Sequence, residues 1–162
     1  MNYDRIYNND MLNGKGLRVV LFLTGCGHKC VGCYNESTWD CSNGKPFTDE
    51  TKKTLLAMLE SPHIDGLTLT GGDPLYKTNL DGVLDIVKTV SAMPDKNIWM
   101  WTGYTMEQAI KNPLRKEILQ YVDFLMDGKY DQKKPTRKPF RGSDNQRLFE
   151  LNKNSIEIKN IS

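Results

Sequence analysis

Residues 18–33 read RVVLFLTGCGHKCVGC, and the interpretation of the whole chain starts from this stretch. Its first part, Arg18 to Thr24, is a nearly continuous apolar run rich in β-branched and aromatic residues, which is typical of a strand buried on both faces. A Cys-x3-Cys-x2-Cys pattern follows, and its glycines permit the tight turns that let three thiolates converge on one centre. The stretch therefore predicts a buried strand leading into a metal-binding loop whose ligands are Cys26, Cys30 and Cys33.

Strands and helices alternate downstream of this first strand. Short apolar runs predict further strands at Leu67–Thr70, Ile98–Trp101 and Val122–Met126. Caps and periodic apolar residues predict helices after Thr48, over Leu80–Val87, after Thr105 and from Asn112-Pro113 to Leu119. Alternation of this kind indicates an α/β fold with a parallel sheet and right-handed crossovers. Four or five strands are too few to close an eight-stranded barrel, so we expect an open, partial parallel β/α barrel.

The chain length of 162 residues suits one domain spanning residues 1–162. We expect its core at about residues 17–130 and a less regular C-terminal segment over residues 131–162. Within that segment, Lys129 to Arg147 is basic and polar and is interpreted as a loop. Its cationic side chains either face water, as charge runs usually do, or dock a partner. Ser155–Lys159 is a candidate for a last strand.

Composition excludes several classes of protein. The formal net charge of +2 is too small to indicate a nucleic-acid partner. All four cysteines lie in the first quarter of the chain, which indicates a metal site in a reducing compartment rather than a disulfide scaffold. The N-terminus carries no signal-peptide core, and no apolar run reaches the roughly 18 residues that span a membrane. We therefore expect a cytoplasmic protein without a membrane partner.

The three clustered cysteines allow two kinds of metal site. Ligation by thiolates alone favours zinc or an iron–sulfur cluster. A structural zinc site is closed by four ligands, whereas three cysteines on a four-iron cluster leave one iron open to a substrate. Either His28 or Cys41 could supply a fourth ligand in a zinc-stabilised interaction module, and otherwise Cys41 is a free thiol. Ligand number and spacing favour the catalytic cluster.

Glycine and polar residues follow the other predicted strands. The second strand ends in Gly71, Gly72 and Asp73, the third in Thr102-Gly103-Tyr104, and the fourth in Asp127. Ligands of parallel α/β folds bind at the carboxyl ends of strands. Two glycines would let the backbone approach a ligand closely, and the Asp73 carboxylate could accept a hydrogen bond from an ammonium group. We therefore expect one binding site that combines these strand ends with the cysteine loop.

The Cys-x3-Cys-x2-Cys pattern followed by aromatic Tyr34 resembles the radical S-adenosylmethionine superfamily. The resemblance implies a [4Fe–4S] cluster on the three cysteines. One electron from it would cleave S-adenosyl-L-methionine to methionine and a 5′-deoxyadenosyl radical, without a side chain acting as acid or base. It also implies S-adenosylmethionine contacts for two groups of residues. The first group is Gly32, Cys33, Tyr34, Gly71, Gly72 and Asp73. The second group, for the nucleoside or carboxylate, is Thr102, Gly103, Tyr104 and Asp127.

Within that superfamily the chain resembles the glycyl-radical-enzyme activases. Asn13-Gly14-Lys15-Gly16-Leu17-Arg18 is similar to their lead-in to the first strand, although Lys15 replaces the usual proline. Tyr34-Asn35, Ser37-Thr38-Trp39, Trp99-x-Trp101 and Arg141-Gly142-Ser143-x-Asn145-Gln146 are closest to the activases of anaerobic ribonucleoside-triphosphate reductases. This resemblance runs from about Met1 to Arg147. It implies the large subunit of that reductase, a glycyl radical enzyme, as partner, and a one-electron donor such as flavodoxin.

Activation of another glycyl radical enzyme, such as pyruvate formate-lyase, remains open at this point. The chemistry would be the same, and only the docking surface would differ. The zinc-stabilised interaction module predicts a colourless protein without turnover, and it gives no reason for the glycine and polar residues at the strand ends.

Overall fold

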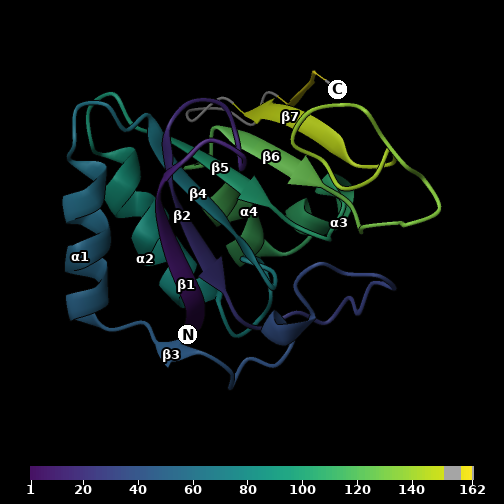
Figure 1. The fold of residues 1–162 in the computed structure, drawn as a ribbon, viewed down its shortest axis with the longest axis horizontal. Helices are drawn as coiled ribbons and strands as arrows, with labels where there is room; N and C mark the ends of the chain where they lie inside the picture. The colour runs from purple at the N-terminus through teal and green to yellow at the C-terminus, as the bar shows by residue number, and fades with distance from the viewer. Residues whose placement is uncertain (152–157, 162) are drawn as a thin grey trace.

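The computed structural model describes residues 1–151 and 158–161, which contain one eight-stranded sheet in the order β3-β1-β2-β4-β5-β6-β7-β8 (Figure 1). Its two outermost strands do not pair with each other, so the sheet is open. The strands are β1 (Asn2–Asp10), β2 (Arg18–Leu23), β3 (Lys45–Pro46), β4 (Gly66–Gly71), β5 (Asn97–Trp101), β6 (Phe124–Asp127), β7 (Arg147–Leu151) and β8 (Ile158–Asn160).

The centre of the sheet is parallel and its flanks are antiparallel. Strands β2, β4, β5 and β6 run parallel to one another, as the sequence predicted. The expectation of a parallel barrel is wrong for the flanks, where β1 pairs antiparallel with β2 and β7 pairs antiparallel with β6. A parallel crossover needs a dozen or more residues and usually a helix. Only residues 11–17 separate β1 from β2, and residues 128–146 form no helix.

Neither flanking strand was predicted from the sequence. Ser155–Lys159, the candidate for a last strand, overlaps β8 at its C-terminal end, and residues 155–157 lie outside the described residues.

The helices lie where their caps and apolar periodicity predict. The structure contains α1 (Asp49–Leu59), α2 (Leu80–Ser91), α3 (Met106–Ile110), α4 (Pro113–Leu119) and a 3-10 turn, η1 (Glu36–Thr38). Thr48 caps α1 by accepting a hydrogen bond from the backbone N–H of Thr51. Thr105 and Gln108 form the expected capping box at α3. No helix among the described residues is long and apolar enough to cross a membrane.

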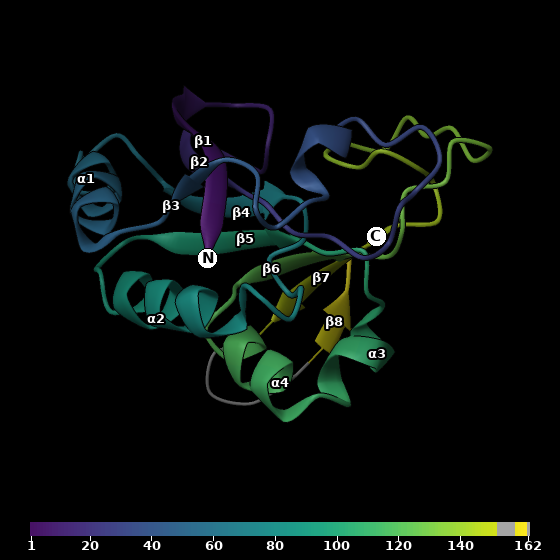
Figure 2. The same cartoon turned by 90° about the horizontal axis from the view of Figure 1, so that it is seen from below.

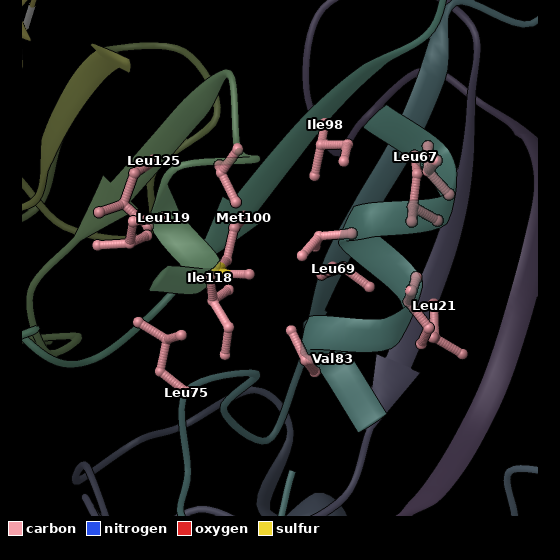
Figure 3. Close-up of a cluster of buried hydrophobic side chains, with 14 of the residues drawn as sticks. Leu21, Leu67, Leu69, Leu75, Val83, Ile98, Met100, Ile118, Leu119 and Leu125 are labelled. Carbon is pink, nitrogen blue, oxygen red and sulfur yellow. The ribbon is translucent and has the colours of Figure 1, made fainter. Parts of the chain in front are cut away.

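The two faces of the sheet differ in what covers them. In Figure 2, α2 and α4 lie on one side of β5 and β6. Figure 3 shows Leu69, Ile98 and Met100 from the sheet meeting Val83 of α2 and Ile118 of α4, and all five side chains are buried. The other face is aromatic: Trp99 stacks on Trp101 and Phe124 with ring centroids 5.8 Å and 4.7 Å apart. Side chains alternate between faces along a strand, so β5 serves both layers.

A buried arginine ties the strands together at the amino end of the parallel sheet. Arg18, fully buried, donates from Nε to Thr68 Oγ1 at 2.7 Å and from Nη2 to the Leu67 carbonyl at 2.8 Å. Burial lowers the pKa of its guanidinium to about 10, against the raising effect of nearby Asp65. The preceding turn needs glycine, because a Cβ on Gly14 (φ +109°) would lie 3.0 Å from the Arg18 side chain. The lead-in thus positions an arginine at the end of the sheet opposite the cysteines.

The loops at the carboxyl ends of the parallel strands hold the predicted site residues. The cysteine loop follows β2, the Gly71–Asp73 segment follows β4, and the Thr102–Tyr104 segment follows β5. The basic loop follows β6. The loops after β2 and β6 both leave the sheet on the right in Figure 1. Lys133, Lys134, Arg137 and Lys138 are exposed on the latter loop, whereas Arg141 is partly buried.

Candidate metal centre and cofactor pocket

The three predicted metal ligands face one pocket at the carboxyl ends of β2, β4, β5 and β6. Glycine and threonine residues of three strand ends complete most of its wall. Its lining consists of Cys26, His28, Cys30, Cys33, Trp39, Thr70, Gly71, Gly72, Trp101, Thr102, Gly103, Gly128, Tyr130 and Gln146. The pocket contains the expected cysteines and the expected Gly71, Gly72, Thr102 and Gly103.

Backbone hydrogen bonds position the cysteine loop against the segment that follows it. The N–H of Gly25 donates to the Thr38 carbonyl at 2.7 Å, and the N–H of Cys26 donates to the Trp39 carbonyl at 3.0 Å. A tight turn brings the second and third cysteines together, because the N–H of Cys33 donates to the Cys30 carbonyl at 3.2 Å. Gly25 (φ +103°) supplies the left-handed conformation at the exit of β2.

The surroundings of Cys26 and Cys30 disfavour a thiolate that has no cation bound to it. Burial raises the pKa of the Cys26 thiol to about 11, partly offset by a backbone hydrogen bond from His28, while Asp73 and the other two cysteines raise it further. Burial also raises the pKa of Cys30. A bound cation stabilises thiolates, and deprotonated cysteine is what metals bind. The donor set therefore fits a thiophilic metal group held by three cysteines.

Cys41 and His28 occupy different environments. Cys41 is exposed and does not line the pocket. His28 lines it, with Nε2 2.6 Å from Asp73 Oδ2. The ligand atoms of Cys26, His28 and Asp73 lie within 4.8 Å of one another, so this trio is a second arrangement able to hold a metal ion. Of the two proposed fourth ligands, only His28 lines the pocket together with the three cysteines.

Asp73 connects three strand ends from beneath the pocket. Its side chain is fully buried, and its Oδ1 accepts from the N–H of Leu75 at 2.9 Å. Thr102 Oγ1 reaches both carboxylate oxygens, at 2.9 Å and 3.0 Å, and the N–H of Gly103 donates to Oδ2 at 3.0 Å. Asp73 does not line the pocket itself. Its observed contacts are with groups that shape the wall.

Tyr104 lies behind His28 rather than in the pocket lining. The two rings meet edge to face with centroids 4.5 Å apart. Arg115 of α4 donates from Nη2 to the Tyr104 hydroxyl at 2.9 Å and stacks 4.0 Å above the ring. Burial raises the pKa of this phenol, and the Arg115 charge opposes the rise. Tyr104 thus links the histidine of the cysteine loop to a helix.

Asp127 is buried at the end of β6 and is paired within the protein. Its Oδ2 accepts from Arg147 Nη2 at 2.6 Å and from the N–H of Met106 at 2.8 Å. Its Oδ1 accepts from Arg147 Nε at 3.1 Å. The neighbouring Gly128 lines the pocket, whereas Asp127 does not. Asp127 anchors the start of both α3 and β7 to this edge of the site.

Gly32 and Tyr34 lie on the outer side of the cysteine loop. Tyr34 is 79% exposed, and its hydroxyl accepts a hydrogen bond from the Tyr130 hydroxyl at 3.3 Å. Gly32 adopts φ +75°, and a Cβ there would lie 2.4 Å from Gln132 Oε1. Both residues therefore contact the loop that follows β6, which puts the two loops side by side.

Besides His28, six lining residues were not among the predicted site residues: Trp39, Thr70, Trp101, Gly128, Tyr130 and Gln146. Trp39 and Gln146 come from segments whose only signal was resemblance, Ser37–Trp39 and Arg141–Gln146. The Gln146 side chain accepts from the N–H of Gly142 at 2.8 Å and donates to the Gly128 carbonyl at 3.0 Å. It fixes one wall of the pocket, a role that depends on pairing across 18 residues and that no local pattern reveals.

Comparison with known proteins agrees with this geometry. Residues 12–149 match the family model of a 4Fe-4S single cluster domain. An anaerobic ribonucleoside-triphosphate reductase-activating protein of Enterobacteria phage T4 is 56% identical over 150 residues, covering 92% of this chain and 94% of that protein. The protein of that name from Pasteurella multocida (strain Pm70) is 44% identical over 153 residues, covering 92% and 97%.

The activating protein of Escherichia coli (strain K12) is 39% identical over 156 residues, covering 93% of this chain and 99% of that protein. These identities extend over almost the full length of each relative, and the matched region includes every residue that lines the cysteine pocket. The chain belongs to the family of anaerobic ribonucleoside-triphosphate reductase-activating proteins with a 4Fe-4S domain.

Proposed function

We propose that this chain activates an anaerobic ribonucleoside-triphosphate reductase by generating a glycyl radical on its large subunit. The observation that carries the proposal is the convergence of Cys26, Cys30 and Cys33 on one pocket with the glycines that end β4 and β5. Three thiolates suit a four-iron cluster with one open iron, and glycines leave room for a second ligand beside it. We infer that this ligand is S-adenosyl-L-methionine.

Each part of the pocket has a separate task in this proposal. The three cysteines would hold the [4Fe–4S] cluster. When bound, the cluster would supply one electron that cleaves S-adenosylmethionine to methionine and a 5′-deoxyadenosyl radical. Cys33, Gly71 and Gly72 would lie along the methionine part, and Thr102 and Gly103 along the nucleoside or carboxylate. The predicted residues Gly32, Tyr34 and Tyr104 do not line the pocket and would support its walls. The proposal requires no side chain to act as an acid or base on the substrate.

The two carboxylates of the predicted site act mainly as supports in this proposal. Asp73 holds the ends of β4 and β5 together, and Asp127 holds α3 and β7 to β6. Because their oxygens already accept several hydrogen bonds, an ammonium or ribose group would have to displace an internal donor to reach them. We expect both residues to shape the S-adenosylmethionine site.

The remaining features of the proposal concern fold and partners. The four central parallel strands would represent a partial β/α barrel of the radical S-adenosylmethionine type within a single domain. The relatives act as activating proteins of the reductase, which supports that enzyme as the partner here. A one-electron donor such as flavodoxin would reduce the cluster. The alternative partner, another glycyl radical enzyme such as pyruvate formate-lyase, has no comparable support.

The proposal is tested anaerobically. The protein is reconstituted with iron and sulfide, reduced, and mixed with S-adenosylmethionine, and 5′-deoxyadenosine is measured. We expect product formation, and with the reductase present a glycyl-radical signal in electron paramagnetic resonance. A reducible cluster without product, even with the reductase, would indicate an electron carrier. A protein that binds zinc and no iron would indicate the interaction module instead.

A further inference from the structure

The loop between β6 and β7 is long, and hydrogen bonds hold it in a defined shape. Residues 128–146 form neither helix nor strand. Loops longer than about 12–15 residues without secondary structure are uncommon in compact domains and usually carry a function or are disordered. Here the N–H of Asp144 donates to the Lys134 carbonyl at 2.8 Å, and the N–H of Asp131 donates to Ser143 Oγ at 3.0 Å. Such bonds between the two arms of the loop indicate a function rather than disorder.

The loop is also fastened to the aromatic face of the sheet. The Phe140 ring meets Trp99 edge to face with centroids 5.4 Å apart, and the Phe140 carbonyl accepts from Trp101 Nε1 at 2.9 Å. Phe140 adopts φ +64°, a left-handed conformation that is uncommon for a bulky residue. The part of the loop before this anchor projects beyond β6, on the right in Figure 1. It is therefore presented at the same end of the sheet as the cysteine pocket.

This loop concentrates the positive charge of the molecule. Residues 129–144 contain six lysine and arginine residues against two aspartates, a balance of +4, whereas the whole chain carries +2. One of the aspartates is already engaged, since Lys138 Nζ lies 3.8 Å from Asp144 Oδ1. Lys133, Lys134 and Arg137 are exposed and form no salt bridge within the part of the chain that the structure describes. Cations crowded without counter-charges favour a partner that brings acidic groups.

Exposed apolar side chains of the cysteine loop lie beside the basic loop. Val31 is 72% exposed and Tyr34 is 79% exposed. The Tyr34 ring has its centroid 5.2 Å from that of Tyr130, which lines the cysteine pocket. Gly32 packs against the side chain of Gln132, so the two loops touch at a second point. Apolar and aromatic residues next to charged ones are typical of protein interfaces. The two loops thus form one continuous surface at the edge of the pocket.

The proposed reaction brings the partner to the same edge. The 5′-deoxyadenosyl radical would take one hydrogen atom from the Cα of a glycine, which forms a C–H bond on the deoxyadenosine and leaves the unpaired electron on the glycine. This transfer needs contact, so the glycine-bearing segment must enter the pocket while the surface around that segment covers the rim. Tyr130 marks the rim, because it lines the pocket and its ring contacts exposed Tyr34.

We propose that Val31, Tyr34, Lys133, Lys134 and Arg137 form the docking surface for the large subunit of the reductase, and that this surface binds acidic side chains flanking the glycine-bearing segment. Val31 and Tyr34 contact the segment close to the pocket, and the three cations attract the acidic groups. This inference rests on the proposed function, because it takes the reductase as the partner. Opposite charges across such a surface chiefly speed association and fix orientation.

Two triple variants that remove equal charge test the cationic part of the docking surface. The loop variant carries Lys133→Gln, Lys134→Gln and Arg137→Gln. The control variant changes exposed lysines of α1, α2 and α4, and it carries Lys53→Gln, Lys88→Gln and Lys116→Gln. Each variant lowers the formal net charge of +2 by three, and none of the six residues lines the cysteine pocket.

The measurements use proteins reconstituted with iron and sulfide and then reduced. Production of 5′-deoxyadenosine without the reductase reports whether the cluster site is intact. Binding of the purified large subunit is measured at about 0.05 M and about 0.5 M salt, which differ strongly in how far charges act. The glycyl-radical signal is recorded at increasing concentrations of the large subunit.

We expect the loop variant to produce 5′-deoxyadenosine at the wild-type rate but to bind the large subunit roughly tenfold more weakly at low salt. The large-subunit concentration that gives half of the maximal glycyl-radical signal should rise by the same factor, with the maximum unchanged. Salt should weaken binding by the wild type more than binding by the loop variant, because screening acts on the charges that the variant lacks. The control variant should stay within about twofold of the wild type throughout.

The apolar part of the docking surface has its own matched pair. Val31→Ser and Met11→Ser each replace an exposed apolar side chain, at 72% and 71% exposure. Met11 follows β1 at the opposite end of the parallel strands, because β1 runs antiparallel to β2. We expect Val31→Ser to weaken binding of the large subunit severalfold at both salt concentrations and Met11→Ser to leave it unchanged. Equal binding by the two variants would overturn the apolar part of the inference.

Other outcomes contradict the docking surface or the reaction separately. Equal binding by the loop variant and the wild type would overturn the inference. Equal weakening in the loop and control variants would also overturn it, because net charge alone would then explain the effect. Loss of 5′-deoxyadenosine production in the loop variant alone would assign the loop to the pocket wall instead. Wild-type protein that produces 5′-deoxyadenosine but no glycyl radical on the reductase would contradict the proposed function, and its binding data would still decide the docking surface.

Discussion

At the scale of single residues, Asp73 is the group on which most of the pocket depends. Its fully buried carboxylate accepts from Leu75, Thr102 and Gly103 and contacts His28, so one side chain joins the ends of β4 and β5 to the cysteine loop. Buried polar networks of this kind are stabilising only when every member is paired. The geometry of the pocket is therefore sensitive to the acceptor capacity of Asp73 and not only to its charge.

Replacing Asp73 with asparagine tests that dependence. The amide nitrogen cannot accept a hydrogen bond, so at least one of the N–H or O–H donors around it loses its partner. We expect the free energy of unfolding of the metal-free protein to fall by about 2–3 kcal/mol, measured by urea denaturation. Asp95→Asn, at an exposed turn position with φ +62°, is the control and should change stability little. Equal stability of Asp73→Asn and wild type would contradict the network.

The cysteines allow a second prediction at this scale. Cys26→Ala, Cys30→Ala and Cys33→Ala should each abolish stable [4Fe–4S] assembly, because each removes one of three ligands. Cys41→Ala should keep full iron content, because Cys41 is exposed and does not line the pocket. Iron and sulfide analysis with the visible absorbance of the cluster provides the measurement. A colourless Cys41→Ala protein would mean that a fourth cysteine ligand had been missed.

Gly72 allows a third prediction at the residue scale, because the backbone of three segments meets at this position. A Cβ would lie within 2.7 Å of the carbonyl oxygens of both Gly25 and Thr38, and backbone cannot yield as a side chain can. Gly72→Ala should therefore push the cysteine loop away from the Trp39 segment and lower the iron content of the reconstituted protein at least severalfold. Gly128→Ala is a useful comparison, since a Cβ there has 3.8 Å of clearance but meets an unfavourable φ of +96°. A fully loaded Gly72→Ala protein would contradict the proposed crowding.

At the scale of elements, Arg18 shows how one side chain can set the alignment of strands. It belongs to β2, donates to Leu67 and Thr68 of β4, and reaches the Asn97 carbonyl of β5 at 3.3 Å. Arg18→Met keeps much of the apolar stem but leaves these acceptors without a donor. We expect a loss of about 3 kcal/mol or more in the free energy of unfolding. Arg137→Met, in an exposed loop, should leave the urea midpoint close to that of the wild type, and a similar midpoint for Arg18→Met would refute this role.

The elements that the sequence predicted are those with a local signal. The four parallel strands are short apolar runs, α1, α3 and α4 have N-cap residues, and α2 has a periodic apolar face, so both kinds of element were recognised. Strand β1 (Asn2–Asp10) is polar and only partly buried, and β7 (Arg147–Leu151) is a short strand in which Arg147 and Glu150 interrupt the apolar residues. They form strands because β1 pairs antiparallel with β2 and β7 with β6. Such pairing cannot be detected from the sequence of each segment taken alone.

In the site, too, the sequence revealed residues that have a local signal and missed those whose role depends on contacts between distant segments. Cysteine spacing predicted that Cys26, Cys30 and Cys33 meet at one centre, and the structure places all three in one pocket, because the loop that carries them is continuous in sequence. Trp39 and Gln146 entered only as parts of resembling motifs, since their roles depend on contacts with Cys26 and Gly128 that form after folding. Asp73 and Asp127 were placed at the correct strand ends, but their internal hydrogen-bond partners could not be derived from the sequence.

At the scale of the whole molecule, the two ends of the parallel sheet have different functions. The amino end is closed by Arg18 and its buried hydrogen bonds, which stabilise the sheet. The carboxyl end carries glycines, exposed tyrosines and partly buried thiols, none of which adds much stability without a ligand. This division is common in parallel α/β folds, where ligands collect at the carboxyl ends of strands. One consequence is that metal binding should order loops which the apolar core does not hold.

An ion-pair group that joins α3, β6 and β7 at the carboxyl end gives the molecule a predictable acid response. Arg147 donates to Glu107 Oε2 at 2.8 Å, and this bond, with a backbone hydrogen bond, lowers the pKa of Glu107 to about 2 from the ordinary 4.5. A carboxyl group with a lowered folded-state pKa stabilises the protein fully above its unfolded pKa, and the stabilisation disappears as the pH falls through the folded value. The relevant window is therefore pH 4.5 down to about 2.

Glu107→Gln should reduce stability at neutral pH, and the difference from wild type should narrow across this window. Because Glu107 is largely solvent-exposed, screening limits the neutral-pH difference to about 1 kcal/mol or less. Urea midpoints of both proteins between pH 6 and pH 2.5 provide the measurement, and roughly 1 M salt should diminish the difference at pH 6 by screening the pair. A difference that stays constant down to pH 2.5 would show that Glu107 contributes through its shape or hydrogen bonding rather than its charge, and that Asp127 alone holds Arg147 in place.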